Sequence, residues 1–432
     1  MSEPIVLKNA RFVLTMDEGK VLENVSIRIS DGKIDYLGEK VRQRGDEVLN
    51  CSGCIVMPGL VNAHTHSSMV ALRGLNDDAP LQDWLKSMWA VEDKLTGDLA
   101  RKASELAFLE MVRTGTTSCL DMYEAFEAAR AAKIVGIRMA NGPALISRFA
   151  SGKERLAQTR AFSEQYQNDG RIRPVVNLHS IYTNDDETIA KAADLSRALS
   201  IPLHVHCSET REEVFTSRKE NGKLAVEKLY SHGALWERSV LVHLGWAASW
   251  EFKRIAEKGS SVVHCPSSNL KLGTGGFFPF RDLKAMGIRI GLGTDSAASN
   301  NSLDMFREMK AAALTQKGQY WDPTACSAHD ALEAATLSGD RILGLKGGAV
   351  MAGLNADLAL VRIGPGILPL RKENLGSALV YSATGDMVRG TMVQGEWVYL
   401  DGKDREGKKI STRSLDLSQE LDEALFNSRS AS

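Results

Sequence analysis

The chain has 432 residues, of which 43% are hydrophobic, and its 53 Lys and Arg against 54 Asp and Glu give a net charge of -1. This length can bury one large core and a smaller one, while the balanced charge provides neither a basic surface for nucleic acid nor an acidic tail for a cationic partner. The start of the chain lacks the features of a signal peptide, and no run of 18 apolar residues predicts a membrane helix. We therefore expect a cytoplasmic protein whose six cysteines are reduced.

The two ends of the chain have the same character. Residues 1–58 predict short strands, with the turn-forming pair Asp31-Gly32 between two of them, and residues 347–402 repeat this pattern. We expect the two segments to form one small domain, a β-sandwich. The remaining tail, 403–432, is charged, and its leucines are spaced as in a short amphipathic helix that docks on the rest of the chain or on a partner.

Residues 59–346 alternate differently, because each short β-branched run is followed by a longer helical stretch. One such stretch runs from Asp98 to Arg113 with apolar residues at helical spacing, and Gly115 ends it. The predicted strands are Val61–His66, Thr116–Asp121, Ile137–Ala140, Pro174–His179, Ile201–His206, Val240–His243, Ser261–Cys265 and Ile288–Asp295. Eight strand–helix units predict an α/β fold, specifically a (β/α)8 barrel of the TIM type.

Histidines collect at the carboxyl ends of these predicted strands. The pair His64 and His66 lies at i and i+2 on one strand, so both imidazoles project from the same side and can bind one metal ion. Other polar groups at strand ends are His179, His206, His243, His264 and Asp295. Taken singly, each histidine is more simply a buried structural residue, and Asp295 is equally well a helix N-cap. Together they predict a metal site, because barrel active sites are built from the carboxyl ends of the strands.

Several segments, in order along nearly the whole chain, resemble a known family. They are Pro58–His66, His204–Thr210, Val242-His243, Val263–Asn269 and Gly293–Asp295. In these segments the chain is similar to the amidohydrolase superfamily. The resemblance implies that one divalent metal ion, zinc first and Fe2+ or Mn2+ as alternatives, is held by His64, His66, His206 and Asp295. It also implies catalytic roles for three residues: His243 and Asp295 act on the attacking water, and Glu209 carries protons.

The strand from Pro174 to His179 indicates the branch of the superfamily. Members with two metal ions bridge them with a lysine at the end of this strand, and here the strand ends in histidine. The resemblance therefore implies a site with one metal ion, as in the deaminases. Two more segments, Gly74–Leu95 and Asn177–Thr183, resemble the 5'-methylthioadenosine/S-adenosylhomocysteine deaminases.

That closer likeness implies which residues bind a nucleoside. Glu92 would accept hydrogen bonds from the ribose hydroxyls, a role that suits a carboxylate because it only accepts. His179 would contact the nucleoside near its 5' side, and Glu209 would touch the purine. Arg148 and Arg155 are further candidates in a region where the pattern matches loosely.

We expect from these residues a hydrolytic deamination that converts an adenine nucleoside to the inosine-type product and ammonia. The alternatives are a related hydrolase of guanine, cytosine, a pterin or an s-triazine, and a non-catalytic relative that keeps only the scaffold. The substrate is expected to be a small-molecule nucleoside, with neither nucleic acid nor a membrane as partner. The 5' substituent, the metal in the cell and a homo-oligomeric state stay open.

Overall fold

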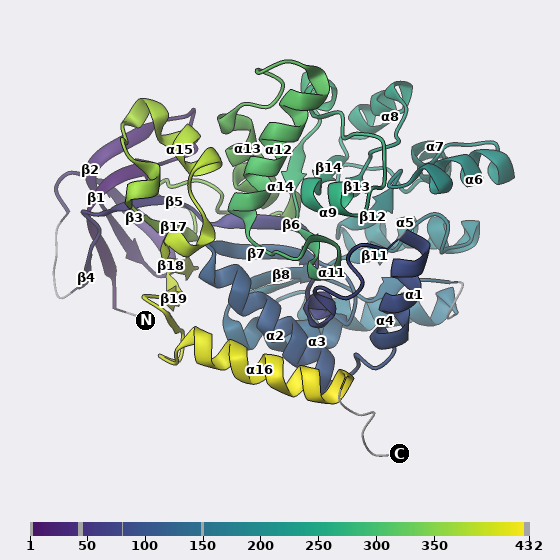
Figure 1. Ribbon diagram of the computed structural model, residues 1–432, viewed down its shortest axis with the longest axis horizontal. Helices are drawn as coiled ribbons and strands as arrows, with labels where there is room; N and C mark the ends of the chain where they lie inside the picture. Colours follow the sequence, from purple (N-terminus) through teal and green to yellow (C-terminus); the bar gives the residue numbers. More distant parts are fainter. Residues whose placement is uncertain (1–2, 42–45, 80, 148–150, 427–432) are drawn as a thin grey trace.

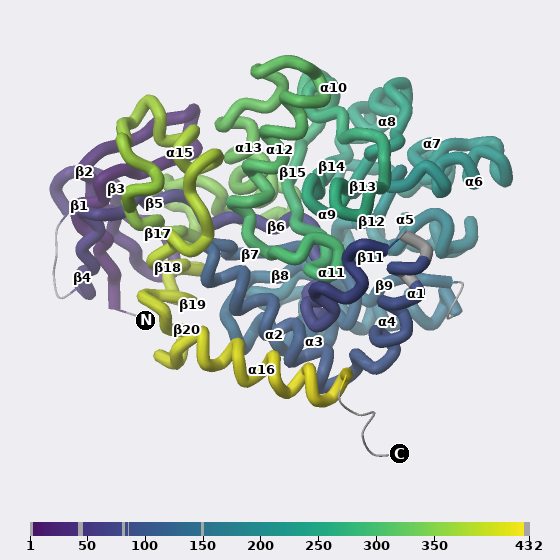
Figure 2. Tube along the Cα trace, in the orientation of Figure 1, coloured from purple at the N-terminus to yellow at the C-terminus, as the bar shows by residue number. Residues whose placement is uncertain are grey.

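The structure, a computed structural model, describes residues 3–41, 46–79, 81–147 and 151–426. Figure 1 shows a large α/β unit and, at one side of it, a sheet built from both ends of the chain. In the tube view of Figure 2, the purple strands of the N-terminal segment lie beside the yellow-green strands of the C-terminal segment. Within the described residues, none of the helices is long and apolar enough to cross a membrane.

The strands from the two ends form one nine-stranded mixed sheet. Across the sheet the order is β20 (Lys403–Asp404), β19 (Glu396–Leu400), β18 (Val388–Val393), β17 (Leu358–Arg362), β5 (Cys54–Pro58), β1 (Ile5–Leu14), β2 (Val21–Ser30) and β3 (Lys33–Gly38), with β4 (Glu47–Asn50) beside β1. The two halves join where β17 runs antiparallel to β5, with Leu358 opposite Pro58. These strands are linked in a single sheet, and the predicted β-sandwich stays a prediction.

The remaining strands form two parallel sheets. One has the order β10 (Ile172–Pro174), β8 (Arg138–Asn141), β7 (Thr116–Asp121), β6 (Leu60–His66) and β16 (Asp295–Ser296). The other has the order β15 (Ile290–Leu292), β14 (Ser261–His264), β13 (Ser239–His243), β12 (Leu203–Cys207), β11 (Val176–Leu178) and β9 (Ala144–Leu145). Every residue of β6 is buried, as expected for a parallel strand covered on both faces.

Two of the predicted strands are each divided between the parallel sheets. The run from Pro174 to His179 breaks at Val175, because the Val175 amide still bonds Asn141 O of β8 (2.9 Å) whereas the Val176 amide bonds Pro202 O next to β12 (2.9 Å). The run up to Asp295 breaks at Gly293, where an added Cβ would lie 2.7 Å from the backbone oxygen of His64. In both places the chain passes from one sheet to the other within a few residues.

Helices alternate with the parallel strands. The α-helices are α1 (Leu81–Glu92), α2 (Asp98–Arg113), α3 (Ala125–Val135), α4 (Gly152–Tyr166), α5 (Asp186–Leu199), α6 (Arg211–Asn221), α7 (Ala225–Ser231), α8 (Phe252–Glu257), α9 (Pro266–Lys271), α10 (Phe280–Ala285), α11 (Ala297–Asn300), α12 (Met305–Tyr320), α13 (Ala328–Ala335), α14 (Leu337–Leu343), α15 (Leu375–Tyr381) and α16 (Ile410–Leu425). The helix predicted from Asp98 to Arg113 is confirmed as α2. The prediction of an α/β fold with parallel strands is also confirmed.

The tail ends in α16, which lies along α2 at the lower edge of Figure 1. It buries Ile410, Leu417, Leu421 and Leu425. Arg413 fastens it, because this side chain pairs with Glu105 of α2 (2.7 Å) and with Asp404 (2.6 Å). All six cysteines are free thiols and buried, as their spacing predicts.

Candidate metal centre

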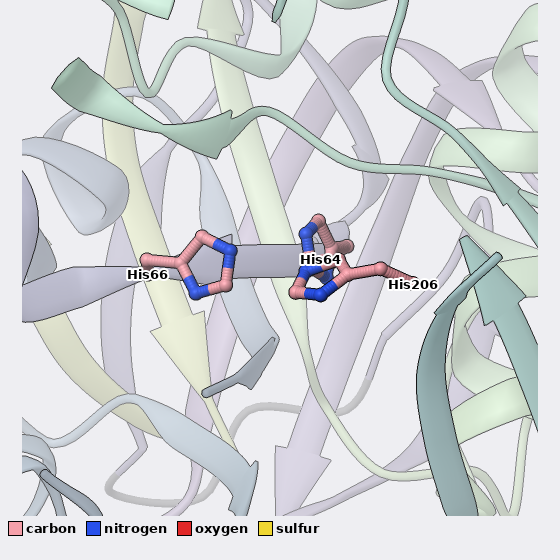
Figure 3. A group of neighbouring side chains, drawn as sticks. All are labelled: His64, His66 and His206. Carbon is pink, nitrogen blue, oxygen red and sulfur yellow. The ribbon is translucent and has the colours of Figure 1, made fainter. Parts of the chain in front are cut away.

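Three imidazoles meet at the carboxyl ends of β6 and β12. The ring centroid of His64 lies 4.8 Å from that of His66 and 4.9 Å from that of His206, and Figure 3 shows the three rings gathered together. Asp295 of β16 completes the group, with its Oδ1 atom 3.3 Å from His64 Nε2 and 3.2 Å from His66 Nε2. The structure thus brings together the four side chains predicted to hold a metal ion.

The chemistry of this group fits a divalent cation. His64 Nε2 and His66 Nδ1 are buried nitrogens without a hydrogen-bond partner. Burial lowers the pKa of His64 to about 4, which keeps the imidazole neutral and able to offer a lone pair. Three imidazoles and one carboxylate form a donor set that zinc accepts. Iron and manganese accept the same donors.

Asp295 is held in a constrained backbone conformation. Its φ is +60°, which lies in the left-handed region that few residues other than glycine occupy. The Ser268 hydroxyl donates to Oδ2 (2.6 Å) and the Ser296 amide donates to Oδ1 (2.8 Å). Burial opposes ionisation, but the pKa of Asp295 lies well below its usual range, because His66 pairs with the charged carboxylate. The carboxylate is therefore fixed and charged.

His243 lies at the end of β13 beside Glu209, which follows β12. Its φ is +79°, so a second residue of the site carries backbone strain. His243 Nδ1 is 3.4 Å from Asn269 Oδ1, and Nε2 is 3.9 Å from Glu209 Oε2. Because Asn269 Nδ2 donates to Thr274 Oγ1 (3.2 Å), the Asn269 oxygen must face the histidine. His243 therefore presents Nδ1 to Asn269 and Nε2 to Glu209.

The backbone at Glu209 is held by the carboxylate of Glu213. Glu213 accepts the backbone N–H groups of Ser208 (3.1 Å) and Glu209 (2.8 Å), and the Thr210 hydroxyl caps α6 by accepting from the Glu213 amide (3.1 Å). Burial raises the pKa of Glu209, and it raises that of Glu213 to about 8. A carboxyl with a raised pKa can deliver a proton near neutral pH.

The residues predicted to bind substrate surround one aromatic side chain. The Tyr123 ring lies 4.9 Å from that of His66 and 5.9 Å from that of His179. Glu92 ends α1. Burial and the nearby charge of Glu92 raise the pKa of Tyr123. The pKa of His66 is raised because Asp295, with smaller contributions from Asp121 and Glu92, outweighs the effect of burial. Burial raises the pKa of Glu92 itself. The structure therefore brings Glu92 and His179 into the neighbourhood of the metal centre.

Of the two arginines predicted to bind substrate, the structure describes only Arg155. Arg155, on α4, lines a pocket of about 370 Å³ together with Tyr123, Glu124 and Glu127. Its guanidinium donates to Gln158 Oε1 (3.2 Å). Arg148 lies outside the described residues.

Sequence reasoning gave no role to several residues that support the site. Asn177 lies buried beneath the histidines, Ser268 and Asn269 hold Asp295 and His243, and Glu213 holds the backbone of Glu209. For two of them the sequence contains a pattern that could have predicted the role. A polar Asn177 between apolar Val176 and Leu178 predicts a buried hydrogen bond, and Thr210-x-x-Glu213 has the spacing of a capping box.

Comparison with known proteins decides the family. Residues 55–398 match the amidohydrolase family. This chain belongs to the amidohydrolase family. It is 40% identical over 415 residues to a protein of Desulfovibrio desulfuricans named 5-methylthioadenosine/S-adenosylhomocysteine deaminase, a match that covers 92% of each chain. It is 37% identical over 405 residues to a 5'-deoxyadenosine deaminase of Methanosarcina mazei, covering 92% of this chain and 93% of that protein.

A solved structure is also similar to this amidohydrolase. An adenosine deaminase from Xanthomonas campestris, crystallised with bound zinc, superposes with a TM-score of 0.90 at 32% identity, covering 96% of this chain and 98% of that one. The likeness confirms a TIM-barrel-type α/β fold and the predicted family. The enzyme class follows: the amidohydrolase is a hydrolase that acts on C–N bonds of cyclic amidines.

Proposed function

We propose that this amidohydrolase deaminates adenine nucleosides hydrolytically, with one divalent metal ion, Zn2+ first, held by His64, His66, His206 and Asp295. The observation that carries the proposal is a buried group of three imidazoles and one carboxylate with Glu209 and His243 beside it. The deaminases of adenine nucleosides among its relatives support the substrate class.

A metal ion bound here would supply Lewis acidity, which brings the pKa of a coordinated water from 15.7 to about 7. Asp295 is ionised and fixed by Ser268, so it serves as the base that accepts a proton from the attacking water. His243 Nε2 orients that water by accepting a hydrogen bond. His243 Nε2 also lies 3.9 Å from Glu209 Oε2.

Glu209 moves the other protons. In its protonated form it donates to a purine ring nitrogen, which withdraws electron density from the carbon that bears the amine. The water oxygen forms a bond to this carbon, and the carbon–nitrogen bond then breaks. The proton taken from the water is returned to the leaving amine, which departs as ammonia. The remaining hydroxyl proton passes to Glu209, which restores its protonated form and leaves the carbonyl of the inosine-type product. General acid–base help of this kind contributes roughly 10²–10⁴-fold.

Glu92 and His179 are proposed to bind the nucleoside. Glu92 ends a helix that packs over the site: Trp84 and Met88 of α1 cluster with Leu72 and Tyr123. A carboxylate in this place can accept hydrogen bonds from both ribose hydroxyls. The Tyr123 ring next to His179 provides an apolar wall for the nucleoside.

The 5' substituent is proposed to enter the pocket that Arg155 lines. This pocket shares Tyr123 with the metal centre, so it adjoins the region assigned to the nucleoside. It offers the guanidinium of Arg155 and the carboxylates of Glu124 and Glu127. A basic and an acidic group together match the carboxylate and the ammonium of a homocysteinyl substituent better than a methylthio group. We therefore expect S-adenosylhomocysteine to be a better substrate than 5'-methylthioadenosine.

The direct test is ultraviolet absorbance of zinc-loaded protein mixed with adenosine, 5'-deoxyadenosine, 5'-methylthioadenosine, S-adenosylhomocysteine, guanine and cytosine. We expect loss of the adenine band and release of ammonia with the nucleosides, fastest with S-adenosylhomocysteine. Turnover of a free base alone would contradict the roles given to Glu92 and His179. An unchanged spectrum with every compound would contradict the proposed substrate class.

A second test removes the acceptor proposed for the ribose. Glu92→Gln should raise KM for the preferred nucleoside by about 10–100-fold, since a hydrogen bond to a charged group contributes about 1.5–3 kcal/mol. The change in kcat should be smaller. The matched control is Asp93→Asn, which alters the exposed carboxylate next in sequence and should leave KM unchanged. Equal KM values for the two variants would refute the ribose contact.

Two structural predictions belong with this proposal. We propose that the two parallel sheets close into one eight-stranded barrel, supported by two consecutive amides that bond into different sheets: Val175 bonds Asn141 O of β8, and Val176 bonds Pro202 O next to β12. We also propose that residues 59–346 form this barrel, and that 1–58 and 347–402 form the small β domain with 403–432 as the tail. The homo-oligomer and the cytoplasmic location stay predictions.

A further inference from the structure

A chain of hydrogen bonds runs from β11 through β12 to the metal centre. Asn177 Oδ1 lies 2.8 Å from His204 Nδ1, and His204 Nε2 lies 2.9 Å from His64 Nδ1. All three side chains are fully buried. Only the last of them belongs to the proposed metal ligands, and neither Asn177 nor His204 has been given a part in the reaction.

The orientation of the Asn177 amide is fixed by its surroundings. Its Nδ2 group donates to the backbone oxygens of Asp121 (3.1 Å) and Gly142 (2.8 Å), and to Asn141 Oδ1 (2.9 Å). Backbone oxygens only accept, so the nitrogen of the amide must point toward them. The oxygen of Asn177 must then point toward His204.

This orientation determines the proton positions on both histidines. Because Asn177 Oδ1 only accepts, His204 carries its proton on Nδ1, and in the neutral ring Nε2 is an acceptor. An imidazolium at His204 would be a buried charge between neutral partners, which is costly. His64 must therefore donate to His204 from Nδ1. Its other nitrogen, Nε2, is left without a proton and lies 3.3 Å from Asp295 Oδ1.

Two acceptors face one another at that position. A lone pair on His64 Nε2 and a carboxylate oxygen repel each other unless a cation lies between them. The opposite tautomer would place a hydrogen on Nε2, which would bond Asp295 and block metal binding. His206 has the same tautomer without an intervening residue, because its Nδ1 donates directly to the backbone oxygen of His179 (2.7 Å).

We infer that Asn177 and His204 are positioning residues that set the tautomer of His64 and thereby keep its Nε2 open to the metal ion. Hydrogen bonds of this outer kind to a metal-binding histidine commonly change metal affinity by 10–100-fold. The inference rests on the metal site of the proposed function. It adds that the tautomer of His64 is already set in the metal-free protein.

The first experiment measures zinc affinity by competition with a chromophoric chelator. Asn177→Leu and His204→Leu should each weaken zinc binding about 10–100-fold. His204→Gln should stay close to the parent protein, because an amide can donate to Asn177 Oδ1 and accept from His64. Gln316→Met, which removes a buried amide of α12, is the matched control and should bind zinc as the parent does. Circular dichroism checks that each variant is folded.

The second measurement reads the tautomer itself in the zinc-free parent protein, so it needs no variant to fold. Ring-nitrogen chemical shifts of 15N-histidine-labelled protein should show His64 protonated on Nδ1. Protonation on Nε2 would overturn the inference, as would parent-like zinc affinity in both leucine variants. Equal losses in His204→Leu and His204→Gln would assign the effect to packing and also overturn it. Failure of the parent to bind zinc would instead refute the proposed metal site, and this inference with it.

Discussion

Glu209→Gln is expected to lower kcat/KM for the preferred nucleoside at least about 100-fold while leaving zinc binding intact. Glutamine keeps the size of the side chain and its hydrogen-bonding oxygen, but it has no acidic proton to give to the purine ring. The residue does not belong to the proposed metal ligands, and its backbone is held by Glu213 rather than by the metal centre. Steady-state kinetics with metal analysis of the same preparation checks both halves of the expectation.

The pH profile provides the sharper readout of this variant. Protonated Glu209 is the active form, and burial raises its pKa, so activity should persist above the usual range of a carboxyl and then fall as rising pH removes the proton. The residual activity of Glu209→Gln should lack this alkaline fall. Glu212→Gln, an exposed position on α6, is the matched control and should keep the parent profile. A Glu209→Gln enzyme with near parental rate would rule out the proton-donor role.

Removing the metal should abolish turnover, and adding zinc should restore it. Among the described side chains of the site, the imidazoles and carboxylates can accept protons, but only a cation lowers the pKa of water by the many units that attack at neutral pH requires. Chelation followed by dialysis, metal analysis and stepwise return of Zn2+, Fe2+ or Mn2+ measures the dependence. Full activity in protein without metal would refute the proposed mechanism.

A variant separates this loss from damage caused by the chelator. His206→Asn should lose most bound zinc, because the ring nitrogen it removes belongs to a buried cluster with the rings of His64 and His66 at about 5 Å. His232→Asn is the matched control: this histidine lies at the end of α7, where it pairs with Asp186. It should keep zinc and activity. Equal zinc content in both variants would remove His206 from the ligand set.

Local sequence patterns anticipated the elements that carry the site, but not where two strands are interrupted. Alternating strand and helix signals placed β6, β7 and β12 to β14 to within about two residues, the usual uncertainty of an element end. Local patterns did not predict the strand breaks at Val175 and Gly293, because each break depends on a partner far away in the sequence. The partner is Asn141 for Val175 and His64 for Gly293. A strand-forming run contains no information on which neighbour its amides will find.

The sequence by itself determined the chemistry of this protein: which residues can ligate a metal ion, and that they stand at the ends of strands. Residue type and local spacing suffice for that, since ligand chemistry belongs to the side chain and strand periodicity to the backbone. Only the tertiary structure decided the hydrogen-bond partners. The proton on His64 is fixed by Asn177, more than 100 residues away, through His204, and no local pattern records a bond between segments that meet only after folding.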